Sequence, residues 1–368
     1  MLVTKLMFQT PTLTIDLGAI TANWLALRAR FTGDECAAVV KADAYGLGMA
    51  DVAIALADAG CDTFFVATAD EAIALRAVLS DVRILVFHGV QEGEEFAFVA
   101  KRIIPVLNSP QQIARWQPMA AEHVHAVSAL HIDTAMGRLG LQPEEFKAML
   151  KAQPGILESV RVGLLLSHFA CAPEPQHPLN AAQYALFADA ASHAPGIPLS
   201  LCNSGGIYLG KEYHFNLARP GCSLYGIAPQ SGVANPMQQV ATWAAPILQV
   251  RTLERDQTIG YGATAKAPKG SRIATIASGY ADGVLRSLSN KAAGYIGKHR
   301  VPLIGRVTMD MLCFDVSAVP EPDLNTATHI ELLGDRDGIR VDDVAEAAGT
   351  IGYEILTRIG TRVRRVYV

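Results

Sequence analysis

One pattern recurs between residues 36 and 225, and it limits the fold more than any other feature. A short apolar or β-branched run ends in a polar residue and is followed by a longer amphipathic stretch. The runs lack alternation of apolar and polar residues, as expected of parallel strands buried on both faces. The eight runs are 36–40, 63–67, 82–87, 103–107, 127–132, 162–167, 199–202 and 215–218. Eight such strands close a TIM-type (β/α)8 barrel, whereas a doubly wound sheet would carry GxGxxG after its first strand, and this chain does not.

The pattern changes near residue 237. From there on, short β-prone runs are separated by Gly, Pro and charged turns, which is typical of an all-β module, with one helix expected in VDDVAEAAG. We therefore expect a barrel over residues 12–236 and a β-rich C-terminal domain over residues 237–368. An N-terminal strand within residues 1–11 is expected to join that domain.

Composition excludes several classes of partner. The chain has 31 Lys and Arg against 35 Asp and Glu, so it carries no basic footprint for nucleic acid or an anionic membrane. Its six scattered cysteines indicate neither a zinc or other metal site nor a disulfide framework. The first residues, MLVTKLMFQTP, lack a cleavage pattern, and no stretch reaches about 18 apolar residues. These features predict a cytoplasmic protein that binds a small molecule.

Polar residues at the ends of the runs are the candidates for chemistry, because a TIM barrel has its active site at the carboxyl ends of its strands. Each candidate has a structural alternative, such as a lysine on the rim, a core histidine or an aspartate that caps a helix. Buried charges are costly, so their gathering at one mouth indicates a site. The candidates are Lys41, Asp133, Arg138, His168, Asn203, Ser204 and Arg219.

Two glycine-containing loops predict a phosphate site. Ser204-Gly205-Gly206 and Pro220-Gly221-Cys222 follow the seventh and eighth runs, where barrels commonly bind a phosphate through backbone N–H groups. A lysine at a strand end together with a phosphate cradle indicates pyridoxal 5'-phosphate (PLP), whose aldehyde forms a Schiff base with a lysine amine.

The ordered motifs of the chain resemble those of the alanine racemases. They are AVVKADAYGLG, DTAMGRLG, SHFA, NSGG, ARPGCSLYG, IGYGATAKA and GRVTMDM, and the similarity runs almost from end to end. The resemblance implies PLP-dependent interconversion of L-alanine and D-alanine, either to supply D-alanine for peptidoglycan or to break down L-alanine. It also implies a homodimer with active sites shared between its subunits.

The resemblance assigns two catalytic bases, one for each face of the substrate. Lys41, which also carries the cofactor, is implied to handle the proton of D-alanine, and Tyr261 of the partner subunit that of L-alanine. His168 is implied to assist Tyr261. Arg219 is implied to meet the pyridine nitrogen and keep it unprotonated, which favours reprotonation over transamination.

Further residues are implied to bind the cofactor or the substrate. Arg138, Met309, Tyr280 and Asp310 are the implied substrate-binding residues, the last three from the C-terminal domain. The implied cofactor-binding residues are Lys41, Tyr45, Arg138, His168, Ser204, Arg219, Gly221, Cys222 and Tyr353.

Two positions depart from the family pattern. His131 stands where some members carry a carbamate-modified lysine, so Arg138 must be oriented differently, by Asp133 or by a bound anion. Ala135 stands where glycine is usual, which makes a positive φ at this position uncertain.

Other functions remain open on the sequence. A broad-specificity amino-acid racemase or a decarboxylase on the same domain plan is the main alternative, although Arg219 opposes the strong electron sink that a decarboxylase needs. A PLP carrier without turnover is less consistent with Tyr261 and the second domain. A barrel enzyme for a sugar phosphate would need no Schiff base, so a cofactor adduct on Lys41 after borohydride reduction would exclude it.

Overall fold

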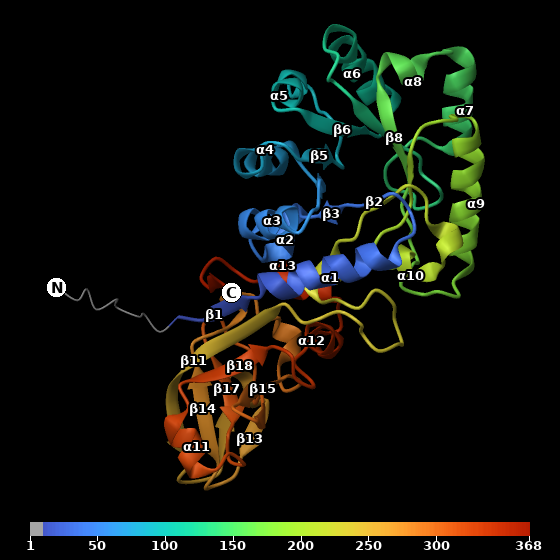
Figure 1. Cartoon of the computed structure of the whole chain (residues 1–368). Helices are drawn as coiled ribbons and strands as arrows, with labels where there is room; N and C mark the ends of the chain where they lie inside the picture. The colour runs from blue at the N-terminus through green and yellow to red at the C-terminus, as the bar shows by residue number, and fades with distance from the viewer. Residues whose placement is uncertain (1–9) are drawn as a thin grey trace, which may run out of the picture. The chain divides into compact units, whose positions relative to one another are not determined.

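The computed structural model describes residues 10–368, which form two compact units (Figure 1). One unit comprises residues 20–238, and the other comprises residues 10–19 together with 239–368. The strand expected within residues 1–11 falls almost wholly outside the described residues. The first described strand is β1, Thr12–Ile15, and it lies in the sheet of the second unit. Helix α1, Leu17–Arg30, follows it.

The parallel sheet of residues 20–238 confirms the predicted barrel. Seven strands pair in chain order, from β3 to β9. They are β3 (Ala38–Val39), β4 (Thr63–Val66), β5 (Arg83–Val86), β6 (Ile103–Leu107), β7 (Ser128–His131), β8 (Val162–Leu166) and β9 (Leu199–Ser200). This curled sheet contains the first seven of the eight predicted runs.

The eighth run closes the ring of strands. Strand β10, Leu217–Ala218, pairs in parallel with β2, Glu35–Cys36, which precedes β3 in the same extended run. Its other edge meets β9, because Asn216 N donates to the carbonyl oxygen of Leu199 (3.0 Å) and Arg219 N to that of Cys202 (2.8 Å). The carboxyl ends of all eight runs therefore lie at one mouth.

Helices connect the barrel strands, and several begin at strong caps. Thr68 and Glu71 form a capping box at α4, while Ser109 caps α6 before a proline in its first turn. Gly60, expected to end a helix, follows α3 with φ of 97°. The helices are α2 (Lys41–Gly46), α3 (Met49–Asp58), α4 (Ala69–Val78), α5 (Glu95–Ala100), α6 (Pro110–Glu122), α7 (Pro143–Ala152), α8 (Ile156–Ser159), α9 (Pro178–Ser192) and α10 (Gly206–Leu209).

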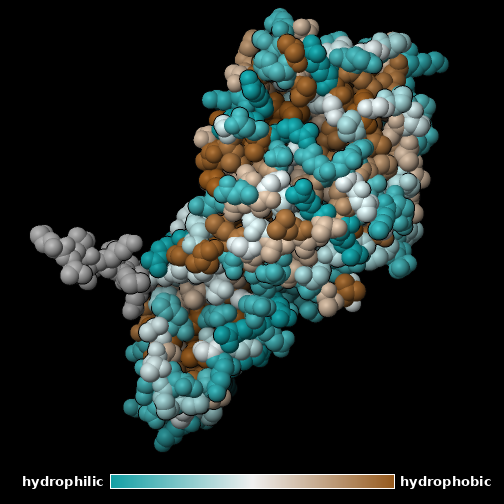
Figure 2. Space-filling view, viewed as in Figure 1, coloured by the Kyte–Doolittle hydropathy of each residue, from teal (hydrophilic) through white to brown (hydrophobic). Residues whose placement is uncertain are grey.

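Apolar side chains from the strands fill the barrel interior, so the barrel is a packed core rather than a channel. Phe65, Val106 and Ala129 in this cluster are fully buried. The whole cluster comprises Ala37, Val39, Phe65, Leu85, Val106, Ala129, Leu164, Leu166 and Leu217. Outside the core, hydrophobic residues show as brown patches among hydrophilic ones on the face seen in Figure 2.

The second unit is mainly β, as predicted. The 12-residue strand β11, Ala241–Thr252, pairs with β1, β14 and β18, and β1 also pairs in parallel with β19. The remaining strands are β12 (Gln257–Ile259), β13 (Ala265–Ala267), β14 (Arg272–Ile276), β15 (Ala293–Ile296), β16 (His299–Pro302), β17 (Leu312–Asp315), β18 (His329–Leu333) and β19 (Arg364–Tyr367). The helix expected in VDDVAEAAG is α12, Val341–Ala348, ended by Gly349 with φ of 74°; α11 is Glu321–Thr326 and α13 is Gly352–Thr357.

None of the helices in the described part of the chain, residues 10–368, combines the length and the hydrophobicity of a membrane span.

We predict that Leu166→Ala lowers the free energy of unfolding by about 2–5 kcal/mol, because it removes methyl groups from the barrel interior and leaves a cavity. Leu186→Ala on α9 is the control, since Leu186 is 39% exposed and its truncation should cost less than about 0.5 kcal/mol. Urea unfolding followed by circular dichroism measures both changes. Equal losses would contradict the placement of Leu166 in the core.

Candidate active site

The barrel strands bring most of the predicted chemistry to one mouth. Lys41 comes two residues after β3, His168 two residues after β8 and Arg219 directly after β10. His131 is the last residue of β7. The charges of Arg219, Arg138, His131 and Lys41 all act on His168, so these groups form one electrostatic cluster.

Arg219 is the most deeply buried charge of this cluster, with 2% of its surface exposed. Its two terminal nitrogens donate to the Ser200 hydroxyl and to the carbonyl oxygen of Ser167, and its guanidinium carbon lies 5.9 Å from the centre of the Phe65 ring. Its Nε has no hydrogen-bond acceptor, and among the described residues no carboxylate forms an ion pair with it. Burial lowers the pKa of Arg219 to about 10, so the group stays charged at neutral pH.

The neighbours of Arg219 are held neutral or shifted toward neutrality. Burial, followed by the charges of Arg219 and Arg138, lowers the pKa of His168 well below its ordinary value. Burial and the charge of Arg138 also lower the pKa of Lys41, while Glu71 opposes this. A lysine with a lowered pKa offers more of its amine in the neutral, nucleophilic form.

The ring of His131 has one assigned proton position, because Asn108 fixes its hydrogen bond. The amide nitrogen of Asn108 donates to the carbonyl oxygens of Phe87 (2.9 Å) and Val106 (2.7 Å), so its oxygen must accept from His131 Nδ1 at 2.8 Å. His131 Nε2 therefore keeps its lone pair. Burial and then the charge of Arg219 lower the pKa of His131 to about 4, so the ring is neutral at pH 7.

The loop that carries Arg138 is shaped by Asp133 rather than by an ion pair. Asp133 is buried, and its carboxylate accepts from Met136 N (2.8 Å) and from Gly137 N. No ion pair joins it to Arg138 among residues 10–368, so the carboxylate orders the backbone around the arginine. Ala135 takes φ of 75°, which shows that alanine here adopts the conformation for which glycine is better suited.

The predicted phosphate loops pack closely together. The Ser204 hydroxyl accepts from Gly221 N (3.0 Å) and Ser223 N (3.3 Å), in the turn where a short 3-10 helix, Cys222–Tyr225, begins. The centre of the Tyr45 ring lies 4.7 Å from the centre of the Tyr225 ring. A Cβ at Gly221 would lie 2.6 Å from the Tyr45 hydroxyl oxygen, so only glycine lets the tyrosine come this close. Tyr45, Ser204, Gly221 and Cys222 thus lie close together, and their binding of a phosphate stays a prediction.

The second unit gathers another set of predicted residues. Tyr280 N donates to the carbonyl oxygen of Thr308 (2.9 Å), and Ala281 N to that of Met309 (3.0 Å). A Cβ at Gly279 would lie 2.3 Å from the Met309 carbonyl oxygen, which explains the glycine before Tyr280. This close approach fixes Tyr280 and Met309 in adjoining loops.

Asp310 is fixed by an arginine that the sequence analysis did not single out. Arg362 Nη1 lies 2.8 Å from Asp310 Oδ1, and Arg362 Nε lies 3.0 Å from Oδ1 of the buried Asp282. Asp282 in turn accepts from Gly279 N at 2.9 Å. A buried carboxylate and an arginine near the C-terminus thus order the segment that carries Asp310, and no motif signalled either residue.

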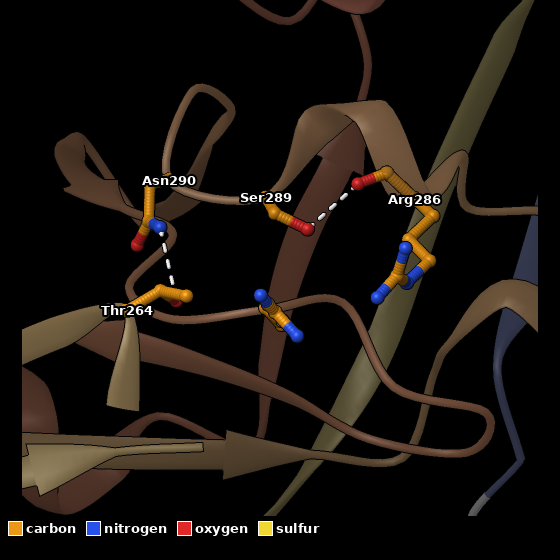
Figure 3. Close-up of a pocket in the computed structure, with 5 residues that line it drawn as sticks. Thr264, Arg286, Ser289 and Asn290 are labelled. Carbon is orange, nitrogen blue, oxygen red and sulfur yellow. Dashed lines mark hydrogen bonds between the residues drawn. The ribbon is translucent and has the colours of Figure 1, made fainter. Parts of the chain in front are cut away.

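A polar pocket of about 220 Å³ in the same unit is lined by Thr264, Arg286, Ser289, Asn290 and Arg306. Figure 3 shows Asn290 and Thr264 directed toward each other and Ser289 beside Arg286; Asn290 Nδ2 donates to Thr264 Oγ1 (3.4 Å). Arg306, also in the lining, has its guanidinium group against Gly262. The predicted base Tyr261, which precedes Thr264 in the same segment, is 74% exposed. Neither arginine was a candidate from the sequence, because Arg306 lies in the motif GRVTMDM without an assigned role and Arg286 lies in none of the quoted motifs.

Tyr353 lies on α13 of the second unit and is half-buried.

Comparison with known proteins identifies the family. Residues 15–229 match the model described as "Alanine racemase, N-terminal domain", and residues 240–367 match "Alanine racemase, C-terminal domain". The chain belongs to the alanine racemase family. It is 51% identical to an alanine racemase of Rhodospirillum rubrum over 97% of this chain and 96% of that protein. It is 47% identical to a catabolic alanine racemase of Agrobacterium fabrum over 97% of this chain and 92% of that protein.

Solved structures of the family have the same fold. The alanine racemase of Bartonella henselae, solved with covalently bound pyridoxal phosphate, superposes with a TM-score of 0.90 at 37% identity. The match covers 98% of this chain and 99% of that one. Barrel and β-rich domain therefore recur together in the family.

We predict that His131 makes the protein less stable as the pH falls from about 6.5 toward 4. Its pKa is about 4 in the folded chain and about 6.5 when unfolded, so the unfolded state binds the extra proton. The contribution of His131 to the free energy of unfolding is complete above pH 6.5, and about 2 kcal/mol of this contribution is lost by pH 5.

Urea unfolding of the wild type and of His131→Asn at pH 7.5 and pH 5 measures this effect. Between pH 7.5 and pH 5, the free energy of unfolding of the variant should fall by about 2 kcal/mol less than that of the wild type. Identical pH dependences would show that His131 titrates normally in the folded chain.

Proposed function

We propose that this protein interconverts L-alanine and D-alanine with pyridoxal 5'-phosphate bound to Lys41. Membership of the family and 51% identity to an alanine racemase support this activity. The structural observation that carries it is the buried guanidinium group of Arg219, which has no carboxylate partner within residues 10–368 and keeps an unsatisfied Nε–H at the barrel mouth.

The residues present fit this cofactor. A buried Nε–H without an acceptor is costly, and the lone pair of an unprotonated pyridine nitrogen would satisfy it. A carboxylate at the same place would instead hold a proton on that nitrogen. We therefore assign the pyridine nitrogen to Arg219 and the aldehyde end to Lys41. Tyr45, Ser204, Gly221, Cys222 and Tyr353 would hold the phosphate, and His168 would lie against the cofactor ring.

The cofactor, once bound, supplies an electron sink that makes the α-proton of the amino acid acidic. The protein's own residues do the rest. Lys41, with a pKa lowered by burial and by Arg138, accepts a proton on one face of the substrate. Tyr261 handles the proton on the other face, and a neutral His168 can accept a hydrogen bond from the phenol. Arg138, the N–H of Met309 and Asp310 orient the substrate, and Tyr280 narrows its path.

A homodimer with shared sites belongs to the same proposal. Tyr261, Tyr280 and Met309 are 74%, 44% and 52% exposed, although large apolar side chains are usually buried. All three belong to the second unit. Arg362 and Asp282 hold the segments of Tyr280 and Met309 in place, and Tyr261 begins a short 3-10 helix, Tyr261–Ala263. We infer that a second copy of the chain covers these residues and receives Tyr261, Met309 and Asp310 into its barrel mouth.

A cytoplasmic location is also proposed. The thiols of Cys36, Cys61 and Cys202 are buried and form no disulfide, as expected of a protein that folds in a reducing compartment.

Incubation with PLP and L-alanine in heavy water tests the activity. We expect α-deuteration, followed by NMR, to keep pace with the approach to a racemic mixture, followed by chiral chromatography. Exchange with retained configuration would mean a single working base and would contradict the role of Tyr261. The same assay with other amino acids distinguishes an alanine enzyme from a broad-specificity racemase, and release of carbon dioxide would reveal a decarboxylase.

Mixing two inactive variants tests the shared site. Lys41→Ala and Tyr261→Phe should each lose at least about 100-fold in rate, because each removes one base. After unfolding and refolding together, heterodimers should regain activity, since one of their two sites is intact. Refolding each variant alone is the control. Activity that stays at the level of the separate variants would contradict the exchange of Tyr261 between subunits.

A further inference from the structure

The backbone after Lys41 adopts an uncommon conformation. Ala42, Asp43, Ala44 and Tyr45 have φ between 51° and 57° and ψ between 36° and 50°, which is one turn of left-handed helix. Non-glycine residues are strained in this region, because their Cβ comes too close to the following carbonyl oxygen. Four such residues in succession persist only where the surrounding structure holds them.

One carboxylate holds the first residue of this turn. Glu71 Oε1 accepts from Ala42 N at 2.7 Å. Its other oxygen accepts from Ala67 N at 2.8 Å and from Thr68 N at 3.3 Å, at the end of β4. Strands β3 and β4 are neighbours, with Val39 opposite Phe65, so the loops that follow them lie side by side. Glu71 therefore joins the turn after Lys41 to the loop before α4.

Helix capping alone does not explain this arrangement. Glu145 of α7 occupies the same position in a capping box, and its carboxylate accepts from Gln142 N at 3.3 Å. That contact stays at its own helix. Glu71 forms the equivalent contact with Thr68 N and in addition reaches the residue next to Lys41.

Electrostatics agree with this geometry. The charge of Glu71 raises the pKa of Lys41, against the lowering by burial and by Arg138. The Lys41 amine lies 5.7 Å from the centre of the Phe87 ring, so its surroundings are partly apolar and a nearby carboxylate acts strongly.

We propose that Glu71 is a positioning residue, whose carboxylate holds the left-handed turn after Lys41 and thereby fixes the lysine amine at the barrel mouth. This inference rests on the proposed function in one respect, namely that Lys41 carries the cofactor. The role requires no contact of Glu71 with cofactor or substrate, since its carboxylate is bound to backbone N–H groups. Its loss would let Ala42 relax toward common backbone angles and would misplace the lysine.

Four variants separate positioning from capping. Glu71→Ala removes the contacts to both loops, and Glu71→Gln keeps a single carbonyl oxygen, which cannot accept from both loops. Thr68→Ala is the matched control, because it removes the hydroxyl that accepts from Glu71 N (3.3 Å) at the same helix end but leaves the carboxylate contacts in place. Glu145→Ala removes a capping glutamate elsewhere in the barrel.

The first readout is PLP affinity, measured by absorbance titration of the full-length apoprotein. Because a hydrogen bond to a charged group is lost, we expect Glu71→Ala to weaken binding about 10- to 100-fold and Glu71→Gln to give an intermediate loss. Thr68→Ala and Glu145→Ala should change the PLP affinity by less than about twofold, although the loss of a helix cap lowers their melting temperatures.

The second readout is the pH profile of covalent loading, trapped by borohydride and quantified as modified Lys41 by mass spectrometry. The charged groups that act on Lys41 are Arg138 and Glu71, and Lys41 in turn acts on the titratable ring of His168. Glu71→Gln removes the negative charge among them, so the loading profile should move to lower pH. A purely structural role would leave it unmoved.

The outcomes separate this inference from the proposed function. If wild-type Lys41 is not modified, the proposed function fails. If the wild type loads normally and Glu71→Gln matches Thr68→Ala in affinity and pH profile, the positioning role of Glu71 is wrong. Circular dichroism identifies a variant that fails to fold, and if Glu71→Ala does so, Glu71→Gln alone decides.

Discussion

Arg219 places a guanidinium group inside the barrel with a hydroxyl and a carbonyl oxygen beside it and no carboxylate among the described residues. This unpaired charge determines much of the surrounding chemistry. Burial, and after it this charge, lowers the pKa of both His168 and His131, so the mouth keeps neutral imidazoles instead of a cluster of cations. Arg219 leaves a buried Nε–H that needs an acceptor. An unprotonated pyridine nitrogen meets this need, and a weaker electron sink suits an enzyme that must return a proton quickly rather than complete a transamination.

Around this buried charge, regular strands and ion pairs hold a strained backbone turn and several exposed side chains in place. The barrel strands fix the backbone positions of Lys41, His168 and Arg219, which follow β3, β8 and β10. The left-handed turn after Lys41 stores backbone strain that a packed barrel can hold in place. In the second unit, Asp282 and Arg362 order a loop whose side chains remain exposed. This organisation agrees with a site completed by a second copy of the chain.

Much of this could be predicted from the sequence, because the signals were local. Eight buried runs with intervening helical patterns predict the barrel, and the order of motifs predicts the family and the candidate residues. Other features depend on contacts distant in sequence. Glu71 reads as an ordinary capping residue until β3 and β4 pair, and Arg362 meets Asp282 and Asp310 only in the folded unit. Asp133 was one of two candidates to orient Arg138, and only the structure shows its carboxylate committed to Met136 and Gly137.

The central claim is that Arg219 keeps the ring nitrogen of the bound cofactor unprotonated. The most direct measurement is the ¹⁵N NMR chemical shift of that nitrogen, in protein reconstituted with ¹⁵N-labelled pyridoxal phosphate near neutral pH. The account predicts the shift of a neutral, hydrogen-bonded pyridine that does not titrate toward the protonated form between pH 6 and 8. The shift of a pyridinium ion across this range would contradict the account, since it would place a proton where Arg219 is proposed to donate its own.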